Sequence, residues 1–191
     1  MADLVETPHG PARIHLRPVD SPRALLALGH GAGGGIASPD LVGATTAANE
    51  AGLSVALVEQ PYRVAGRRSP APARQLDESW LAVVEQLPDL PLIVGGRSSG
   101  ARVACRTAGA AGAEAVLCLA FPLHPPGRPE KTRLAELEEV RVPVLVVQGE
   151  RDPFGIPPSG KNREIALVAG THSLRSSGAV AEAVAEWLAH R

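Results

Sequence analysis

The sequence lacks long apolar runs, and this excludes the class of proteins with membrane-spanning helices. No stretch approaches the roughly 20 consecutive apolar residues that a membrane-spanning helix requires. Residues 1–6 have neither the basic start nor the apolar stretch of a secretory signal peptide. We therefore expect a cytoplasmic protein that does not bind a membrane.

An excess of charge of one sign is also missing. The 191 residues include 19 Lys and Arg against 20 Asp and Glu, which gives a formal net charge of -1. Such a balance provides no electrostatic basis for binding nucleic acid or an anionic membrane. We expect neither as a partner. The class of function that remains is chemistry on small molecules.

Cysteine is scarce, since only Cys105 and Cys118 occur. They fall in a predicted helix and a predicted strand, and neither their spacing nor neighbouring histidines indicate a metal site. We expect two reduced thiols that pack in the core as small apolar residues. The sequence gives no reason to expect a metal or any other cofactor.

The sequence does contain an alternation of short β-rich runs with helical patterns. The predicted strands are 13–17, 24–28, 54–58, 92–94, 115–119, 144–147 and 165–168, and the main predicted helices are 39–51, 72–87, one after residue 98, and 180–188. This alternation predicts a doubly wound, mainly parallel α/β sheet with helices on both faces. Ser38 is the expected cap of the first helix. Residues 1–191 are enough for one good core, so we expect a single domain.

The most informative motif is the G-x-S-x-G sequence at residues 96–100, which follows an apolar run and opens a helix of small residues. In this context the motif is typical of a nucleophile elbow, a tight strand-to-helix turn that exposes a serine. Glycine is needed on both sides because a Cβ there would collide with the neighbouring strand or helix. Ser98 is therefore the candidate nucleophile, and the alternative is a serine that only forms a turn.

Two further polar residues each lie just beyond the end of a later predicted strand. Asp152 belongs to a Gly-Glu-Arg-Asp segment, and His172 to a Gly-Thr-His segment. We predict that His172 is the base that activates Ser98 and that Asp152 orients it. The alternatives are structural roles for both, with Asp152 capping its loop and Glu150 as the reserve acid.

A glycine-rich loop, Gly-His-Gly-Ala-Gly-Gly-Gly at residues 29–35, follows the predicted strand 24–28. It resembles the His-Gly oxyanion loop of esterases and lipases. By analogy with that fold, the backbone N–H groups of Ala32 and Ser99 are predicted to stabilise the oxyanion of a tetrahedral intermediate. His30 is expected to shape this loop beside the substrate.

Loops at the carboxyl ends of parallel strands are where ligands bind in such sheets. The arginine-rich segment 60–68 lies at that edge and supplies Tyr62 and Arg63 as predicted substrate contacts. An arginine fork suits a carboxylate or a phosphate, while the alternative is a solvated loop paired with Asp77 and Glu78. The remaining predicted contacts are Phe121, His124 and Phe154.

The segment 121–142 is where a hydrolase of this kind would insert a lid. It has room for one short helix and not for a cap of several helices. We therefore expect a shallow site that is roofed only by loops.

These motifs resemble the α/β-hydrolase superfamily over nearly the whole chain. More narrowly, segments 60–66, 95–98, 121–127 and 148–155 resemble a group of small hydrolase-like proteins that includes a testis-expressed protein and a subunit of a chromatin-modifying complex. The resemblance implies a dienelactone-hydrolase-like domain without a lid, and it implies no particular substrate.

Together these patterns predict a serine hydrolase that cleaves a small ester or a related acyl compound through an acyl-enzyme at Ser98. We expect a monomer or a homodimer. One alternative is a thioesterase or C–C bond hydrolase with the same triad. The other is a protein-interaction module whose active site is vestigial.

Overall fold

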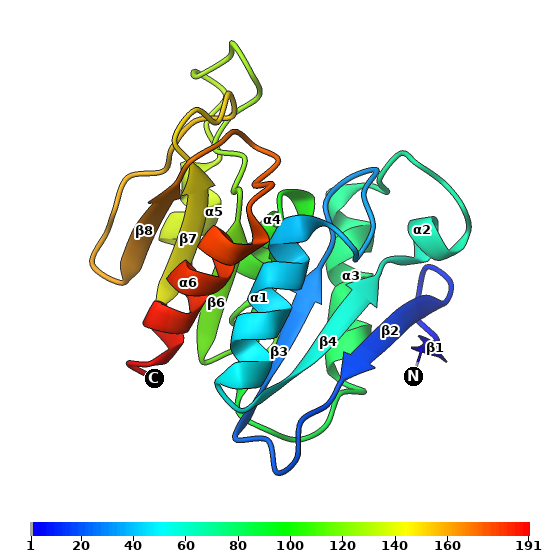
Figure 1. Ribbon diagram of the computed structural model, residues 1–191. Helices are drawn as coiled ribbons and strands as arrows, with labels where there is room; N and C mark the ends of the chain where they lie inside the picture. The colour runs from blue at the N-terminus through cyan, green and yellow to red at the C-terminus, as the bar shows by residue number, and fades with distance from the viewer. Residues whose placement is uncertain (1) are drawn as a thin grey trace.

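A single eight-stranded sheet forms the centre of the computed structural model, which describes residues 2–191 (Figure 1). Its strands are β1 (Ala2–Val5), β2 (Ala12–Arg17), β3 (Ala24–Gly29), β4 (Leu53–Glu59), β5 (Leu92–Arg97), β6 (Ala115–Leu119), β7 (Val144–Gly149) and β8 (Arg163–Val168). They lie in the order β1-β2-β4-β3-β5-β6-β7-β8. The pairs β1–β2 and β2–β4 are antiparallel, and all other pairs are parallel. The mainly parallel sheet predicted from the sequence is confirmed.

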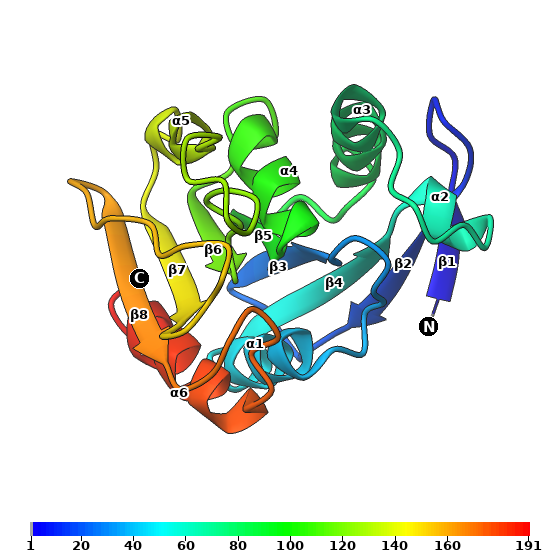
Figure 2. The ribbon, with the colours of Figure 1, turned by 90° about the horizontal axis from the view of Figure 1, so that it is seen from above.

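Helices cover both faces of the sheet. They are α1 (Pro39–Glu50), α2 (Pro61–Val64), α3 (Ala73–Val84), α4 (Ser99–Thr107), α5 (Leu134–Glu138) and α6 (Ser177–Leu188). Figure 2 shows α1 and α6 on one face and α3, α4 and α5 on the other. A separate apolar cluster fills each of the two layers. Strands β3, β6 and β7 are therefore buried along their whole length, as expected for parallel strands covered on both sides.

Some local features differ from the sequence-based expectations. The edge strand β1 and the single turn of α2 were not predicted, and α3 ends at Val84, before Leu87. Ser38 occupies the N-cap position of α1, as predicted, but its side chain accepts no capping hydrogen bond. The side chain of Asp40 instead accepts a hydrogen bond from the N–H of Leu41, at 2.9 Å, in the first turn of α1.

Between β6 and β7 the chain adds only loops and the short helix α5, so the predicted absence of a multi-helix lid is confirmed. Within residues 2–191, no helix has both the length and the apolar composition needed to cross a membrane.

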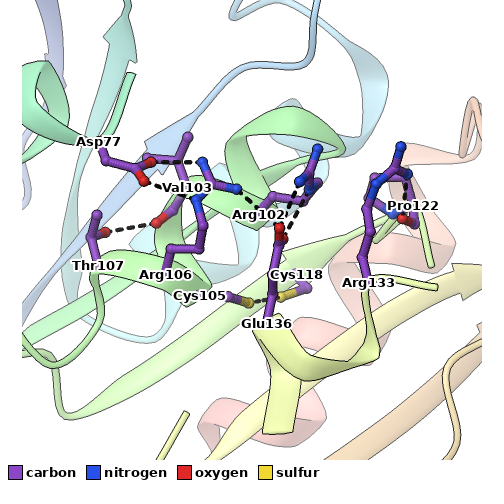
Figure 3. Close-up of polar contacts among 10 residues, drawn as sticks. All are labelled: Asp77, Arg102, Val103, Cys105, Arg106, Thr107, Cys118, Pro122, Arg133 and Glu136. Carbon is purple, nitrogen blue, oxygen red and sulfur yellow. Dashed lines mark hydrogen bonds and ion pairs between the residues drawn. The ribbon is translucent and has the colours of Figure 1, made fainter. Parts of the chain in front are cut away.

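Ion pairs join the helices of the α3–α4–α5 layer to one another (Figure 3). Arg106 on α4 contacts both carboxylate oxygens of Asp77 on α3, at 2.6 and 2.8 Å. Arg102, also on α4, contacts both oxygens of Glu136 on α5, at 2.6 and 2.9 Å. These pairs hold the outer surface of α4, the helix that begins directly after Ser98.

The two cysteines lie beneath this layer, where α4 packs on β6 (Figure 3). Their sulfur atoms are 3.4 Å apart, and both side chains are buried, as predicted. The hydrogen bond with Cys105 and burial both raise the pKa of the Cys118 thiol. Since thiolate is the reactive form of cysteine, Cys118 is an unreactive core residue.

Candidate active site

The turn between β5 and α4 holds Ser98 in an uncommon backbone conformation. Its φ is 52° and its ψ is -106°, in a region that residues other than glycine rarely adopt. The Ser98 N–H donates to the carbonyl of Leu119 on the neighbouring strand β6, at 2.9 Å, which fixes the turn. Such strained residues persist where the surrounding structure determines them, and they cluster at functional sites.

Two glycines allow β5 and α4 to approach β3 closely. A Cβ on Gly96 or on Gly100 would collide with the carbonyl oxygen of Gly29 at the end of β3. Any larger residue at either position would push the turn away from the sheet. The G-x-S-x-G motif therefore has the physical basis that the sequence predicted for it.

Ser98, His172 and Asp152 form a continuous chain of hydrogen bonds. The Ser98 Oγ lies 2.9 Å from the His172 Nε2, and the His172 Nδ1 lies 2.8 Å from the Asp152 Oδ2. An ionised carboxylate can only accept hydrogen bonds, so the Nδ1 of His172 carries the proton. The Nε2 is then free to accept the proton of the Ser98 hydroxyl. This arrangement can support nucleophilic catalysis.

Gln148, near the end of β7, holds Asp152 in place and was not recognised from the sequence. Its side-chain amide donates to the Asp152 Oδ2 at 2.8 Å, and to the carbonyls of Phe121 and Gly155. The other oxygen of Asp152, Oδ1, accepts from the N–H of Phe154 at 2.8 Å. The signal that the sequence offers is a polar residue that directly continues the apolar run 144–147. In the structure this residue is fully buried.

Glu150, the reserve acid, is exposed and lies outside this hydrogen-bonded chain. Asp152 is buried, with 7% of its surface exposed. The structure thus brings Asp152, and not Glu150, to His172. Among residues 2–191, no group of three or more potential metal ligands comes together.

The glycine-rich loop after β3 lies against the turn that holds Ser98. A Cβ built on Gly31 would lie 3.6 Å from the Cβ of Ser98. The N–H groups of Ala32 and Ser99 donate no hydrogen bond within the described part of the chain. Neither N–H group is therefore occupied by an acceptor from this part of the chain.

His30 holds this loop and is not accessible to a substrate. It is 3% exposed, its Nδ1 lies 2.9 Å from the Gly31 carbonyl, and its Nε2 accepts from the N–H of Gln60 at 3.1 Å. Burial lowers the pKa of His30, and the positive charge of Arg63 lowers it further. The neutral ring can donate from one nitrogen and accept at the other, as both contacts require. These contacts fit the expected loop-shaping role of His30, whereas the prediction that His30 also contacts a substrate is wrong because the ring is buried.

Two other predicted substrate contacts are also buried. Phe121 has no exposed surface and belongs to the core, so the prediction that its side chain contacts a substrate is wrong. Tyr62 is 6% exposed and packs edge-on against His30, with ring centroids 5.7 Å apart. Both follow the end of a strand, but their large apolar rings turn into the core because burial there is favourable.

Phe154 lies in the loop that carries Asp152, and His124 lies beside this loop. The Phe154 ring packs on the His172 imidazole, with centroids 4.1 Å apart. The His124 N–H donates to the carbonyl of Phe154 at 3.0 Å, and its Nδ1 lies 2.9 Å from the Pro125 carbonyl. Both side chains are half-buried, so they can line the space beside His172.

The arginine-rich segment 60–68 lies next to the glycine-rich loop, where the carbonyl oxygen of Arg68 is 3.6 Å from a Cβ built on Gly33. Arg63 is half-buried and donates to the carbonyl of Arg67, while Arg67 and Arg68 are exposed. None of the three forms an ion pair within residues 2–191, because Asp77 pairs with Arg106 and Glu78 with Arg74 and His9. The expected alternative, a loop neutralised by Asp77 and Glu78, therefore does not describe Arg63, Arg67 and Arg68.

Comparison with known proteins adds a family and a set of related structures. Residues 22–178 match the model of a family described as the alpha/beta hydrolase domain. No sequence among the curated proteins matches this chain.

Several solved structures share the whole fold. Est1E from Butyrivibrio proteoclasticus is 18% identical, with a TM-score of 0.79 over 99% of this chain and 98% of its own. A serine hydrolase without a lid from Xanthomonas campestris is 21% identical, with a TM-score of 0.73 over 98% and 94%. A dienelactone hydrolase from Anabaena variabilis is 18% identical, with a TM-score of 0.74 over 100% and 96%. At these identities the likeness establishes the fold, which is that of the α/β hydrolases.

Proposed function

Because the chain belongs to the alpha/beta hydrolase family, we propose that it is a serine hydrolase that cleaves small esters or related acyl compounds. The observation that carries the proposal is the hydrogen-bonded chain from Ser98 through His172 to Asp152. Membership of the narrower group with the testis-expressed protein and the chromatin-complex subunit stays a prediction from the motifs.

The first half of the reaction forms an acyl-enzyme. The Ser98 Oγ attacks the carbonyl carbon of the substrate while its proton passes to the His172 Nε2. Asp152 stabilises the resulting imidazolium, and the N–H groups of Ala32 and Ser99 donate to the oxyanion. The tetrahedral intermediate collapses when the bond to the leaving oxygen breaks and His172 returns the proton to it. The products are an alcohol and an ester between the acyl group and Ser98.

The second half releases the acyl group. Water attacks the acyl carbon and gives its proton to His172, and the bond to the Ser98 Oγ then breaks as that proton is returned to the serine. The same steps apply to a thioester, for which the leaving group is a thiol. They apply also to a C–C bond that lies next to a carbonyl. The triad by itself therefore does not determine which leaving group the protein prefers.

The absence of a multi-helix lid predicts a preference for short acyl chains. The side chains available as walls are Ile36, Leu123 and Phe154, which are half-buried. Each CH₂ group adds about 0.8 kcal/mol of binding only where it meets an apolar wall. With p-nitrophenyl esters of increasing chain length, we expect kcat/KM to be highest for short chains and to decline for long ones.

A matched panel of thioesters, measured with the same protein, tests which leaving group is preferred. A folded protein that hydrolyses none of these compounds contradicts the proposal. If kcat/KM instead rose steadily up to long-chain esters, a second copy or another subunit would have to supply the missing wall. That result would exclude the small-substrate proposal.

The unpaired arginines predict a preference for an anionic group on the substrate. Hydrogen bonds to charged groups contribute about 1.5–3 kcal/mol, so Arg63→Gln should raise KM for an anionic ester about tenfold. KM for a neutral ester of the same size should stay nearly unchanged. Steady-state kinetics with both esters at low and high salt measure this effect, which salt should weaken.

Arg74→Gln is the matched control, because Arg74 follows in the next segment but is paired with Glu78. It should alter neither KM. Equal changes for the two esters in Arg63→Gln would show that this arginine has no part in recognising charge.

A further inference from the structure

Arg97, the residue before Ser98, has a side chain that the reaction described above does not use. Its Nε lies 2.8 Å from the Oδ2 of Asp40, at the start of α1. Asp40 has no exposed surface, and the side chain of Arg97 is 18% exposed. A buried carboxylate is costly without a cation beside it. The contact is an ion pair without a hydrogen bond, since neither the Arg97 Nε nor the Asp40 Oδ2 has a hydrogen-bond partner. The attraction of the two charges holds the guanidinium beside α1.

The same guanidinium reaches two catalytic segments. Its Nη2 donates to the main-chain carbonyl of His172 at 3.2 Å. Its Nη1 lies where a side chain at Gly31 would be, 2.6 Å from the position of a Cβ built there. One planar group is thus in contact with α1, the oxyanion loop and the His172 loop.

We propose that Arg97 is a positioning residue. It holds the loop that carries His172 and the glycine-rich oxyanion loop (residues 29–35) in the correct position relative to Ser98. This inference rests on the proposed function. Because Arg97 lies directly next to Ser98 in the chain, its guanidinium holds both loops at a fixed distance from the turn that carries Ser98. Asp152 and Phe154 restrain the imidazole of His172, and Arg97 restrains its main chain.

The proposal depends on a property that arginine has and lysine lacks. A guanidinium has five N–H donors in a rigid plane, so it can face Asp40 and the His172 carbonyl together. A lysine ammonium is a compact charge on a flexible stem. It can neutralise Asp40 but cannot bridge to the His172 loop with the same geometry.

The first test is Arg97→Lys, measured by steady-state ester hydrolysis and thermal unfolding. Displacement of a catalytic group by about 1 Å can cost on the order of a hundredfold in rate. We expect kcat to fall ten- to a hundredfold, with KM within about twofold of wild type, because the substrate contacts are untouched. The melting temperature should change little. Wild-type kcat in Arg97→Lys overturns the inference and leaves the proposed function intact.

Arg102→Lys is the matched control for this substitution. Arg102 lies on α4, four residues after Ser98, and forms a bidentate ion pair with Glu136 (Figure 3). Within residues 2–191, its side chain forms no hydrogen bond with the glycine-rich loop or with the loop that carries His172. Its kcat should stay within about twofold of wild type, since exposed and half-exposed ion pairs contribute little. A similar loss of kcat in both variants would show that any change near α4 impairs the enzyme.

A double variant separates positioning from stability. Arg97→Met and Asp40→Asn each leave one partner of the pair without the other, so each should lower the melting temperature. Combining them removes both charges, and the melting temperature should recover. We expect kcat to stay low in the double variant, because the bond to the His172 carbonyl is still missing. Recovery of kcat together with stability would show that Arg97 is merely structural.

The rate at which a fluorophosphonate probe labels the wild-type protein separates the two proposals. Labelling of wild type with unchanged labelling of Arg97→Lys overturns only the inference about Arg97. A folded wild-type protein that is not labelled overturns the proposed function and the inference with it.

Discussion

Replacing Ser98 with alanine is expected to abolish ester hydrolysis and to leave the fold intact. The substitution removes only the Oγ, the atom that lies 2.9 Å from the His172 Nε2. In serine hydrolases with such a triad, loss of the nucleophile lowers kcat on the order of 10⁶-fold. Alanine keeps a Cβ at this backbone position, so the cost in stability should be small. Hydrolysis of a short ester and a thermal unfolding curve measure both effects.

Ser99→Ala is the matched control, because Ser99 is proposed to contribute only its backbone N–H. It should retain most of the activity and should still react with a fluorophosphonate probe. Mass spectrometry of the labelled wild-type protein should place the adduct on Ser98. An inactive Ser99→Ala together with an active Ser98→Ala would show that the nucleophile has been assigned to the wrong serine.

Much of the sheet could be predicted because its strands are continuous apolar runs. The residues of β3 and β7 are fully buried, and parallel strands covered by helices on both faces need such runs. β1 escaped prediction because it has four residues and is exposed at three of them. It is a strand because it pairs with β2, and a contact of this kind leaves little trace in the local sequence.

The candidate site was accessible from the sequence for a topological reason. The carboxyl ends of parallel strands lie at one edge of a sheet, so polar residues that follow different strands converge there. That argument finds Ser98, Asp152 and His172 without any knowledge of the distances. It could not find the contacts of Arg97 or Gln148, because each depends on a partner that the sequence does not identify.

The same argument predicted too many substrate contacts. Position after a strand does not say whether a side chain turns toward the loop surface or back into the core. Phe121 and His30 both turn inward, Phe121 because its ring is large and apolar, and His30 because Gly31 and Gln60 satisfy both ring nitrogens. Burial, and not location along the chain, separates such residues from those that line the site.

Asp152→Asn is expected to lower kcat by about 10⁴-fold, the loss seen when a triad aspartate becomes an amide and the histidine adopts the wrong tautomer. Three donors surround this carboxylate: the His172 Nδ1 and the Gln148 amide at Oδ2, and the Phe154 N–H at Oδ1. Asparagine has a single acceptor oxygen. Whichever way its amide is turned, its NH₂ group faces at least one of these donors. Because the site is buried, stability should also fall by about 1–3 kcal/mol.

Glu150→Gln distinguishes this specific effect from a general loss of negative charge near His172. Glu150 lies two residues away on the same loop, but it is exposed and outside the hydrogen-bonded chain. Its substitution should leave kcat and the melting temperature close to those of wild type. If Glu150→Gln were inactive while Asp152→Asn kept its activity, Glu150 would be the acid. The loop after β7 would then have to rearrange when substrate binds, because only a rearrangement could bring an exposed carboxylate to the position that Asp152 occupies beside His172.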